Sequence, residues 1–496
     1  MSPKLFPPSL PCLFIHFLAC VSASEMPRLS ISGRPNWKNL KAKSNSPALN
    51  DLKEVYYTQT LDHFNYRPDS YKTFKQRYFI NTKYWGGANS SSPIFAYLGA
   101  EQPITNDLVV AGFLNDNAPD FKALIVFIEH RYYGESVPFG SLDNAFHSTN
   151  TLGYFTSTQA LADYAEVLMS LKKNLSAESC PIIVMGGSYG GMLASWFRLK
   201  YPHIAMGALA SSAPILYFED IVPQDIYYVI ATNDYKEASM NCYKTIRKSW
   251  SVINKIASQA NGLSLLSKIF KTCKPINDSS ELRDYLDGMY TQAAQYDAPP
   301  NYPVNRICDG IDKASKATAD TLSRIAAGVV AFNGNKKCYD LQAGNIVTYD
   351  RLGWFWQTCT DLAISMGRNH ENTMFSVAPY SLENYTKACQ QTFDATLKAR
   401  PHWIVNEFGG RNIKRVLKKF GSNIIFSNGL RDPYSGGGVL RNISNTLVAI
   451  HAAEGSHCLD ILGSSKDDPI WLTKMRASIV KILKDWIAEY YKMLRS

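Results

Sequence analysis

The chain has 496 residues, 46% of them hydrophobic, and a formal net charge of +10 at pH 7. This length and apolar content allow a large core, in two domains or in one domain with a large insertion. Lys and Arg are scattered along the sequence, which is typical of a solvated surface and excludes nucleic acid as an expected partner.

The first 23 residues are expected to be a cleaved signal peptide. Lys4 precedes an apolar stretch at 10–21, and small residues end at Ala23. Neither this stretch nor any later one is long and apolar enough to predict a membrane span. Residues 24–50 are rich in Ser, Pro, Asn and Lys and are predicted to be a linker or pro-segment. We therefore expect the secretory pathway, with the lysosome or vacuole and the extracellular space both open as destinations.

Residues 51–215 are predicted to form the first part of an α/β domain. Apolar runs that predict buried strands alternate there with a stretch of helical spacing at 158–173. Such alternation indicates a mostly parallel sheet with helices on both faces. The predicted strands are 94–98, 123–129, 181–184 and 207–211.

The strand pattern stops near Pro214 and returns near residue 423. Residues 216–414 contain helical segments and few convincing strands, so we expect a helical insertion, or cap, in the sheet domain. Residues 415–496 are predicted to complete that domain, with strands at 423–427 and 446–451 and a final amphipathic helix at 470–494.

Eight cysteines remain after the signal peptide, and six of them lie between positions 242 and 389. In an oxidising compartment this clustering predicts disulfides within the insertion. The sequence contains no Cys-x-x-Cys and no His-x-x-His pair, so we expect no metal site, and nothing indicates another cofactor. Five N-glycosylation sequons suit a secreted route: Asn89, Asn174, Asn277, Asn384 and Asn442.

The segment 185–192 (MGGSYGGM) places Ser188 between glycines, directly after a predicted strand and before a helical pattern. A serine at such a corner sits on a strained turn with its hydroxyl exposed, and side chains in place of the glycines would clash with the strand and helix. We interpret Ser188 as a nucleophile; a glycine-rich turn without chemistry is the alternative. The backbone N–H of Tyr189 would then lie at a helix N-terminus, where it can stabilise an oxyanion.

A serine nucleophile needs a base and an acid, which in α/β-hydrolases follow it in the order Ser, Asp or Glu, His, on loops after later strands. His457, in a loop of small residues after the last predicted strand, is the predicted base, whereas His451 suits the end of that strand. Asp432, in the loop after the preceding strand, is the predicted acid, and Asp460 violates the order. The alternatives are that His457 is an ordinary surface histidine and that Asp432 only initiates an Asp-Pro turn.

Several segments resemble the serine peptidase family that contains lysosomal Pro-X carboxypeptidase and dipeptidyl peptidase II. The resemblance runs from about residue 55 to the C-terminus, and residues 218–223 (FEDIVP) look closer to the Pro-X carboxypeptidase branch. It implies an α/β-hydrolase with a helical cap, cleavage next to proline, and Ser188, Asp432 and His457 as the triad. The matching segments are 61–64 (LDHF), 129–136 (EHRYYGES), 158–163 (TQALAD), 187–191 (GSYGG) and 427–433 (SNGLRDP).

The same resemblance implies the disulfide pairing of the cap. The expected pairs are Cys242–Cys308, Cys273–Cys338 and Cys359–Cys389. The Pro-X carboxypeptidase pattern has a fourth cap pair, neither cysteine of which is present here. Cys180 and Cys458 are therefore expected to be free thiols.

The chain departs from the family pattern around the expected site. Cys458 replaces a second histidine, and Leu462 stands near a usual arginine, which puts the recognition of a substrate carboxylate in doubt. The loop 99–102 lacks the asparagine usual after its glycine, so the second oxyanion donor stays open. Tyr434 replaces a usual tryptophan. Tyr434 and Met192 are candidates for an apolar pocket around a proline ring, but both could equally be ordinary core residues.

The sequence thus predicts a serine exopeptidase of the Pro-Xaa carboxypeptidase type, whose partners are peptides with proline near one end. A dipeptidyl peptidase that releases N-terminal Xaa-Pro or Xaa-Ala dipeptides is the main alternative, because the two differ only in the charged terminus that they bind. A lipase or esterase, and an inactive binding protein on a hydrolase fold, are further alternatives, although no triad member is missing. Whether the chain forms a homodimer is open.

Overall fold

The computed structural model describes residue 29 and residues 51–496, apart from 219–220, 316–319, 344–346 and 370. The predicted signal peptide at 1–23 and the predicted linker at 24–50, except for Leu29, lie outside the described residues. Glu219 and Asp220, which contribute to the resemblance, lie outside them as well.

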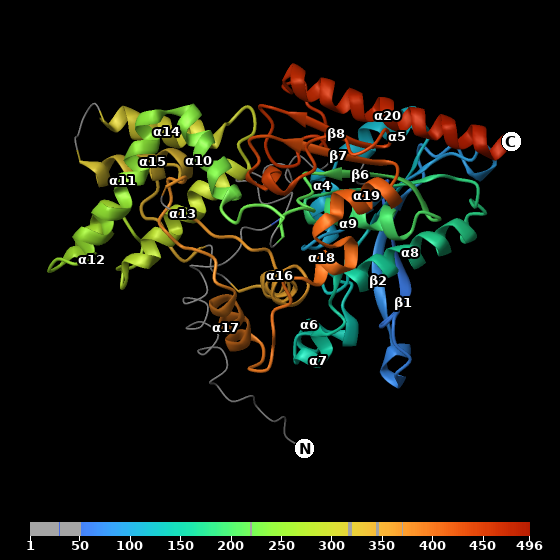
Figure 1. Cartoon of the computed structure of the whole chain (residues 1–496), viewed down its shortest axis with the longest axis horizontal. Coiled ribbons are helices and arrows are strands. Elements are labelled where there is room, and N and C mark those ends of the chain that lie inside the picture. The colour runs from blue at the N-terminus through green and yellow to red at the C-terminus, as the bar shows by residue number, and fades with distance from the viewer. Residues whose placement is uncertain (1–28, 30–50, 219–220, 316–319, 344–346, 370) are drawn as a thin grey trace.

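An eight-stranded sheet forms the centre of the larger domain in the described part of the chain (Figure 1). Its strand order is β1-β2-β4-β3-β5-β6-β7-β8, and all neighbours from β4 to β8 are parallel, whereas β1–β2 and β2–β4 are antiparallel. The strands are β1 (Lys53–Thr60), β2 (Thr73–Asn81), β3 (Ile94–Leu98), β4 (Leu124–Ile128), β5 (Ile182–Gly187), β6 (Ala205–Ser211), β7 (Ile424–Gly429) and β8 (Leu447–Ala452). The predicted strands from 94–98 onward are confirmed as β3 to β8, and β1 and β2 were not predicted.

Successive side chains of the central strands enter two hydrophobic cores, one on each face of the sheet. In β3, Ile94, Ala96 and Leu98 pack into the first core, and Phe95 and Tyr97 pack into the second. Burial on both faces explains why these strands are continuous apolar runs. The first core includes α8 (Ser157–Asn174) and α9 (Tyr189–Lys200), and the second includes α4 (Ile104–Val110), α5 (Phe113–Phe121) and α20 (Ile470–Arg495).

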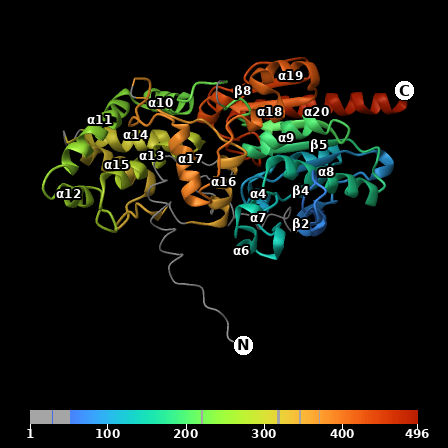
Figure 2. The ribbon, with the colours of Figure 1, turned by 60° about the horizontal axis from the view of Figure 1, so that its bottom comes forward.

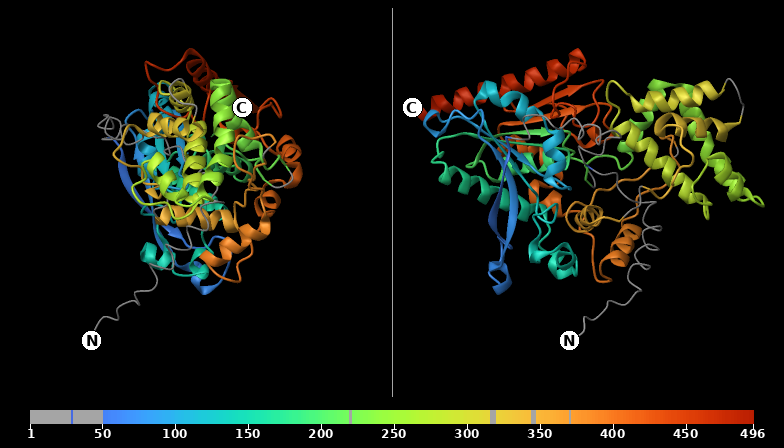
Figure 3. Two further views of the ribbon diagram at one scale, coloured as in Figure 1. Left: turned by 90° about the vertical axis from the view of Figure 1, so that its left-hand side faces the viewer. Right: turned by 180° about the vertical axis from the view of Figure 1, so that it is seen from behind.

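The final helix shows how the sequence pattern produces this layering. Leu472, Met475, Ile479, Leu483 and Trp486 are buried and recur at helical spacing along α20. Burial of each such side chain stabilises the folded state by roughly 1.5–3 kcal/mol relative to leaving it exposed to water. Figure 3 shows α20 running along the sheet domain, as expected from the predicted helix at 470–494.

Helices fill the chain between β6 and β7 and form the cap (Figures 1 and 2). α13 begins with a capping box, in which Asp278 and Glu281 satisfy the backbone donors of the first turn. The cap helices are α10 (Ile226–Ala238), α11 (Met240–Ala257), α12 (Gly262–Ile269), α13 (Ser279–Gln295), α14 (Pro303–Ser315), α15 (Thr321–Asn333), α16 (Tyr349–Thr360) and α17 (Leu382–Thr392). The remaining helices are the short α6 (Leu142–Ala145), α7 (Thr149–Leu152), α18 (Trp403–Phe408) and α19 (Ile413–Phe420).

Three disulfides join cap elements, in the pairs that the resemblance implies: Cys242–Cys308, Cys273–Cys338 and Cys359–Cys389. The first connects α11 to α14 and the third connects α16 to α17. Cys180 and Cys458 are free and buried.

The insertion returns to the sheet domain before residue 415. The Phe408 ring in α18 stacks on the Trp196 ring in α9, with centroids 4.3 Å apart and planes 7° from parallel. Figures 1 and 2 both draw α18 and α19 beside α9. α18 therefore packs on the sheet domain. No helix in the described residues is long and apolar enough to cross a membrane.

Candidate active site

Ser188 forms a tight corner between β5, which ends at Gly187, and α9, which begins at Tyr189. Its backbone angles are φ 60° and ψ −122°, a strained conformation for a residue with a side chain. The corner also needs glycine beside it, because a Cβ on Gly186 would lie 2.1 Å from the backbone oxygen of Gly190. The local sequence thus forces the strained turn that the segment 185–192 predicts.

The structure brings Ser188, His457 and Asp432 into one hydrogen-bonded relay. The imidazole Nε2 of His457 lies 2.8 Å from the Ser188 Oγ, and its Nδ1 lies 2.6 Å from Asp432 Oδ2. The three residues follow β5, β8 and β7, so the parallel sheet delivers them to the same edge. Asp432 is held in turn, because its Oδ1 accepts the backbone N–H of Tyr434 at 3.0 Å.

The relay is buried, and burial and charge act on it in opposite directions. All three side chains belong to residues with 0% exposure. Burial lowers the pKa of His457, but the Asp432 carboxylate, with a smaller effect of Cys458, raises it by more. Asp432 therefore favours the imidazolium that would form when His457 accepts a proton.

Asp460 holds the loop that carries His457 against two strands. Its carboxylate accepts hydrogen bonds of 2.6 Å from the hydroxyls of Ser211, at the end of β6, and Ser427, in β7. The next residue after the histidine is tied as well, because the backbone N–H of Cys458 donates to the Ser212 hydroxyl at 2.9 Å. Sequence reasoning excluded Asp460 as the triad acid and missed this supporting role, for which no spacing rule exists.

The proposed oxyanion donor, the N–H of Tyr189, opens α9 directly after Ser188. The loop that follows β3 lies against the same turn: a Cβ on Gly190 would approach the Leu98 oxygen to 2.9 Å and the Ala100 Cβ to 3.6 Å. This neighbourhood suits a second donor from the loop 99–102.

The cap covers the histidine. The backbone N–H of His457 donates to the carbonyl of Gln295, the last residue of α13, at 3.1 Å. The Tyr296 ring meets the imidazole edge-on at 6.0 Å, and the Tyr434 ring lies 5.7 Å from it on the sheet-domain side. Tyr434 thus borders the triad, whereas Met192 is buried within the first hydrophobic core.

A charged cluster that the sequence analysis missed lies near Asp432, the predicted acid. Arg431 reaches Glu237 in α10 at 3.2 Å and Asp297, just beyond α13, at 3.9 Å. Burial raises the pKa of Asp297 to about 6, although the Val304 N–H and Arg431 both lower it. Burial, and then the charge of Asp297, raises the pKa of Asp234 to about 9. These residues come from elements that are distant in the sequence, so no motif could predict the cluster.

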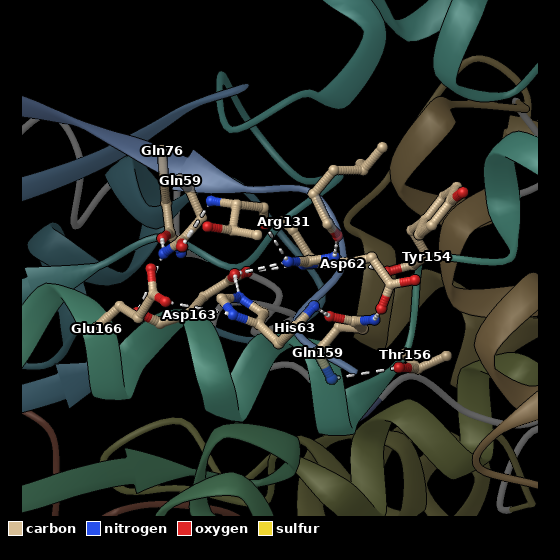
Figure 4. Close-up of polar contacts among 12 residues, drawn as sticks. Gln59, Asp62, His63, Gln76, Arg131, Tyr154, Thr156, Gln159, Asp163 and Glu166 are labelled. Atoms are coloured by element: carbon tan, nitrogen blue, oxygen red, sulfur yellow. Dashed lines mark hydrogen bonds and ion pairs between the residues drawn. The ribbon is translucent and has the colours of Figure 1, made fainter. Parts of the chain in front are cut away.

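Three of the motifs that carry the resemblance meet in a second polar cluster (Figure 4). Asp163 in α8 accepts two hydrogen bonds from the Arg131 guanidinium, at 2.6 and 2.7 Å, and lies 2.8 Å from His63 Nε2. Gln159 donates to Asp62 at 2.7 Å. This cluster ties the end of β1, the loop after β4 and α8 together, so these motifs are explained by folding contacts.

The strand order, the strained serine corner after β5 and the helical cap define an α/β-hydrolase. The model of the family described as serine carboxypeptidase S28 matches residues 59–479, so the chain belongs to this family of serine-type peptide hydrolases. The predicted fold and family are thereby confirmed.

The curated relatives cover most of the chain. Lysosomal Pro-X carboxypeptidase of Homo sapiens is 37% identical over 452 residues, which span 88% of each chain. The protein of that name in Mus musculus is 36% identical over 500 residues, 97% of this chain and 99% of the relative. Thymus-specific serine protease of Homo sapiens is more distant, at 28% identity over 460 residues, 86% of this chain and 85% of the relative.

Proposed function

We propose that the protein is a Pro-Xaa carboxypeptidase, which removes a C-terminal residue that follows proline through an acyl-enzyme on Ser188. The observation that carries the proposal is the Ser188–His457–Asp432 relay, with contacts of 2.8 and 2.6 Å, in a chain of the serine carboxypeptidase S28 family. Similarity to proteins named lysosomal Pro-X carboxypeptidase supports the specificity and a lysosomal or vacuolar destination. Glycosylation at the five sequons is part of the proposal and is supported by the exposure of all five asparagines.

In the proposed reaction, His457 Nε2 accepts the proton of the Ser188 hydroxyl as Oγ attacks the carbonyl of proline. The N–H of Tyr189 stabilises the negative charge that develops on the carbonyl oxygen. The imidazolium, stabilised by Asp432, then gives its proton to the departing amine of the C-terminal residue. Water repeats the sequence on the ester and releases the peptide with a new C-terminal proline.

Burial of the triad means that the cap or its adjoining loops must move to admit a substrate. An enclosed site of this kind suits a peptide end and disfavours a folded protein or an internal loop. Tyr434, which borders His457, is proposed to contact the proline ring, and Met192 is proposed to back the same pocket from the core.

A carboxypeptidase must also bind a carboxylate, and we assign this part to Arg431. Arg431 directly precedes Asp432 in the chain and its side chain is 27% exposed, whereas Leu462 is apolar and packs against the second core. Asp297 competes for the guanidinium and, with a pKa of about 6, loses its charge in acid. Carboxylate binding should therefore be strongest below pH 6, where Arg431 has one competitor fewer.

The experiment compares peptides with blocked ends. An N-blocked peptide that ends in Pro-Xaa with a free carboxylate should release Xaa, and its C-terminal amide should react far more slowly. Arg431→Leu should raise KM for the free acid and reduce this preference. Release of dipeptides from unblocked peptides, abolished by N-terminal blocking, would establish the dipeptidyl peptidase alternative instead.

The nucleophile has a matched control on its own helix. Ser188→Ala should lower kcat by a factor of about 10⁴ or more. Ser195→Ala, which removes a buried hydroxyl that donates to the Met192 carbonyl in α9, should keep both activity and reaction with a fluorophosphonate. Full activity of the Ser188→Ala protein would refute the acyl-enzyme.

A further inference from the structure

The side chain of Tyr189 lies in a chain of hydrogen bonds that reaches the cap. Its hydroxyl is 3.1 Å from His130 Nε2 and 3.0 Å from Gln357 Nε2, and Gln357 is in α16 of the cap. The amide oxygen of Gln357 accepts the Tyr133 hydroxyl at 2.7 Å. His130 Nδ1 lies 2.7 Å from the Arg131 carbonyl. The chain therefore connects the segment 129–136, the serine corner and α16.

Only one arrangement of protons satisfies every member. A carbonyl accepts only, so His130 Nδ1 carries the proton. Burial lowers the pKa of His130 to about 4, so above that pH the ring is neutral and its Nε2 accepts from the Tyr189 hydroxyl. The Tyr189 oxygen then accepts from the Gln357 amide. Rotating that amide by 180° would set the Tyr189 hydroxyl against two acceptors, His130 and the amide oxygen, with one proton to share.

The chain is also enclosed. His130, Tyr133, Tyr189 and Gln357 each have 0% exposure, so no water replaces a lost partner cheaply. The Trp354 ring of α16 packs 5.6 Å from the Tyr189 ring, and the His130 ring lies 5.7 Å from it. The Tyr189 side chain is thus held from the sheet domain and from the cap at once.

We propose that Gln357 is a positioning residue for catalysis, which fixes Tyr189 and with it the backbone N–H that faces the oxyanion. Tyr189 is the first residue after the strained Ser188, so a displacement of its anchored side chain shifts its Cα and, with it, the peptide unit that carries the donor. The proposal also couples the cap to the chemistry: α16 completes the donor geometry only when it lies against the sheet domain. It rests on Ser188 as nucleophile and is independent of the substrate's proline.

The test uses Gln357→Leu, Tyr189→Phe and the double variant. Removing one oxyanion donor costs about 10²–10³-fold in kcat, so displacing it should cost roughly 10- to 100-fold. KM for the peptide should change by less than about threefold, and the affinity for a peptide boronate, whose tetrahedral adduct mimics the oxyanion, should fall by the same factor as kcat. The double variant should be no worse than the more damaged single variant, because both break one contact.

Tyr235→Phe is the matched control. It removes a buried cap hydroxyl that donates to the Tyr290 carbonyl at 3.3 Å, so its kcat should equal that of the wild type. A folded Gln357→Leu protein with kcat and boronate affinity within twofold of wild type would overturn the inference, as would multiplicative losses in the double variant. If Gln357→Leu fails to fold, Tyr133→Phe, which removes the hydroxyl that donates to the Gln357 amide oxygen, is measured in its place. Its kcat should fall about threefold, and an unchanged kcat would overturn the inference. A wild-type protein that fails to react with a fluorophosphonate would instead overturn the proposed function.

Discussion

Replacement of Asp297 by Asn should make the protein more stable at neutral pH while leaving its stability in acid unchanged. Burial raises the pKa of Asp297 from 3.8 to about 6. The folded state thus binds the proton more tightly than the unfolded chain, so stability is full below the unfolded value and falls as the pH rises through 6. A shift of about two units corresponds to roughly 3 kcal/mol. Asn cannot ionise and still accepts the Val304 N–H, which lies 3.1 Å from Asp297 Oδ1.

The assay is thermal unfolding of wild type and Asp297→Asn, followed by calorimetry at pH 3.0, 6.0 and 7.5. The variant should unfold at the same temperature as wild type at pH 3.0, below the unfolded pKa, and several degrees higher at pH 7.5. Asp309→Asn, at an exposed cap position 3.6 Å from Lys313, should show no such pH-dependent difference. A difference between Asp297→Asn and wild type that stays constant across these pH values would refute the reasoning.

Three further substitutions test other contacts. Burial lowers the pKa of His63, but its contacts with Asp163 and Glu166 raise it by more. His63→Gln should therefore lower the unfolding temperature at pH 5, where the histidine is charged, and have little effect well above the raised pKa. Equal losses of unfolding temperature in these two conditions would contradict this prediction. Asp460→Ala deprives two buried hydroxyls of their acceptor and should cost roughly 2–6 kcal/mol in urea unfolding, so a loss below 1 kcal/mol would be evidence against its supporting role. Gly186→Ala places a Cβ 2.1 Å from a backbone oxygen of α9, so this variant should react with a fluorophosphonate more slowly than wild type. Reaction of the Gly186→Ala protein at the wild-type rate would disprove the need for glycine at this position.

The arrangement of Ser188, His457 and Asp432 could be predicted from the sequence because each residue is constrained locally or by chain order. The glycines around Ser188 leave few structures other than the strained corner. Once that strand was placed, the order of an α/β-hydrolase left two histidines to consider, and His451 proves to be an exposed residue of β8. The parallel pairing of β5, β6, β7 and β8 then brings the three loops together.

The first two strands were not predicted because buried polar residues interrupt their apolar face. In β1 the single fully buried residue is Gln59, whose amide donates to Gln76 of β2 at 2.8 Å. In β2, Tyr78 and Ile80 pack against the first core and Phe74 is buried, but Gln76 interrupts their alternation. The buried amide pair satisfies its hydrogen bonds inside the sheet and weakens the apolar signal in the sequence.

Supporting residues such as Gln357 and Asp460 were invisible for a different reason. Each is one polar residue in an apolar surrounding, and its partner is chosen by tertiary packing. The Tyr189–Gln357 contact spans 168 positions and the Ser211–Asp460 contact spans 249. No periodicity or motif relates positions so far apart, so such contacts become known only with the fold.

The cap holds both halves of the proposed catalytic apparatus through different helices. The end of α13 accepts the backbone N–H of His457, and α16 donates to the hydroxyl of Tyr189. One contact orients the loop of the base and the other the turn of the oxyanion donor. A movement of α13 and α16 away from the sheet domain would break both contacts. Under the proposed mechanism, the base and the donor would therefore be aligned together only while these helices lie against it.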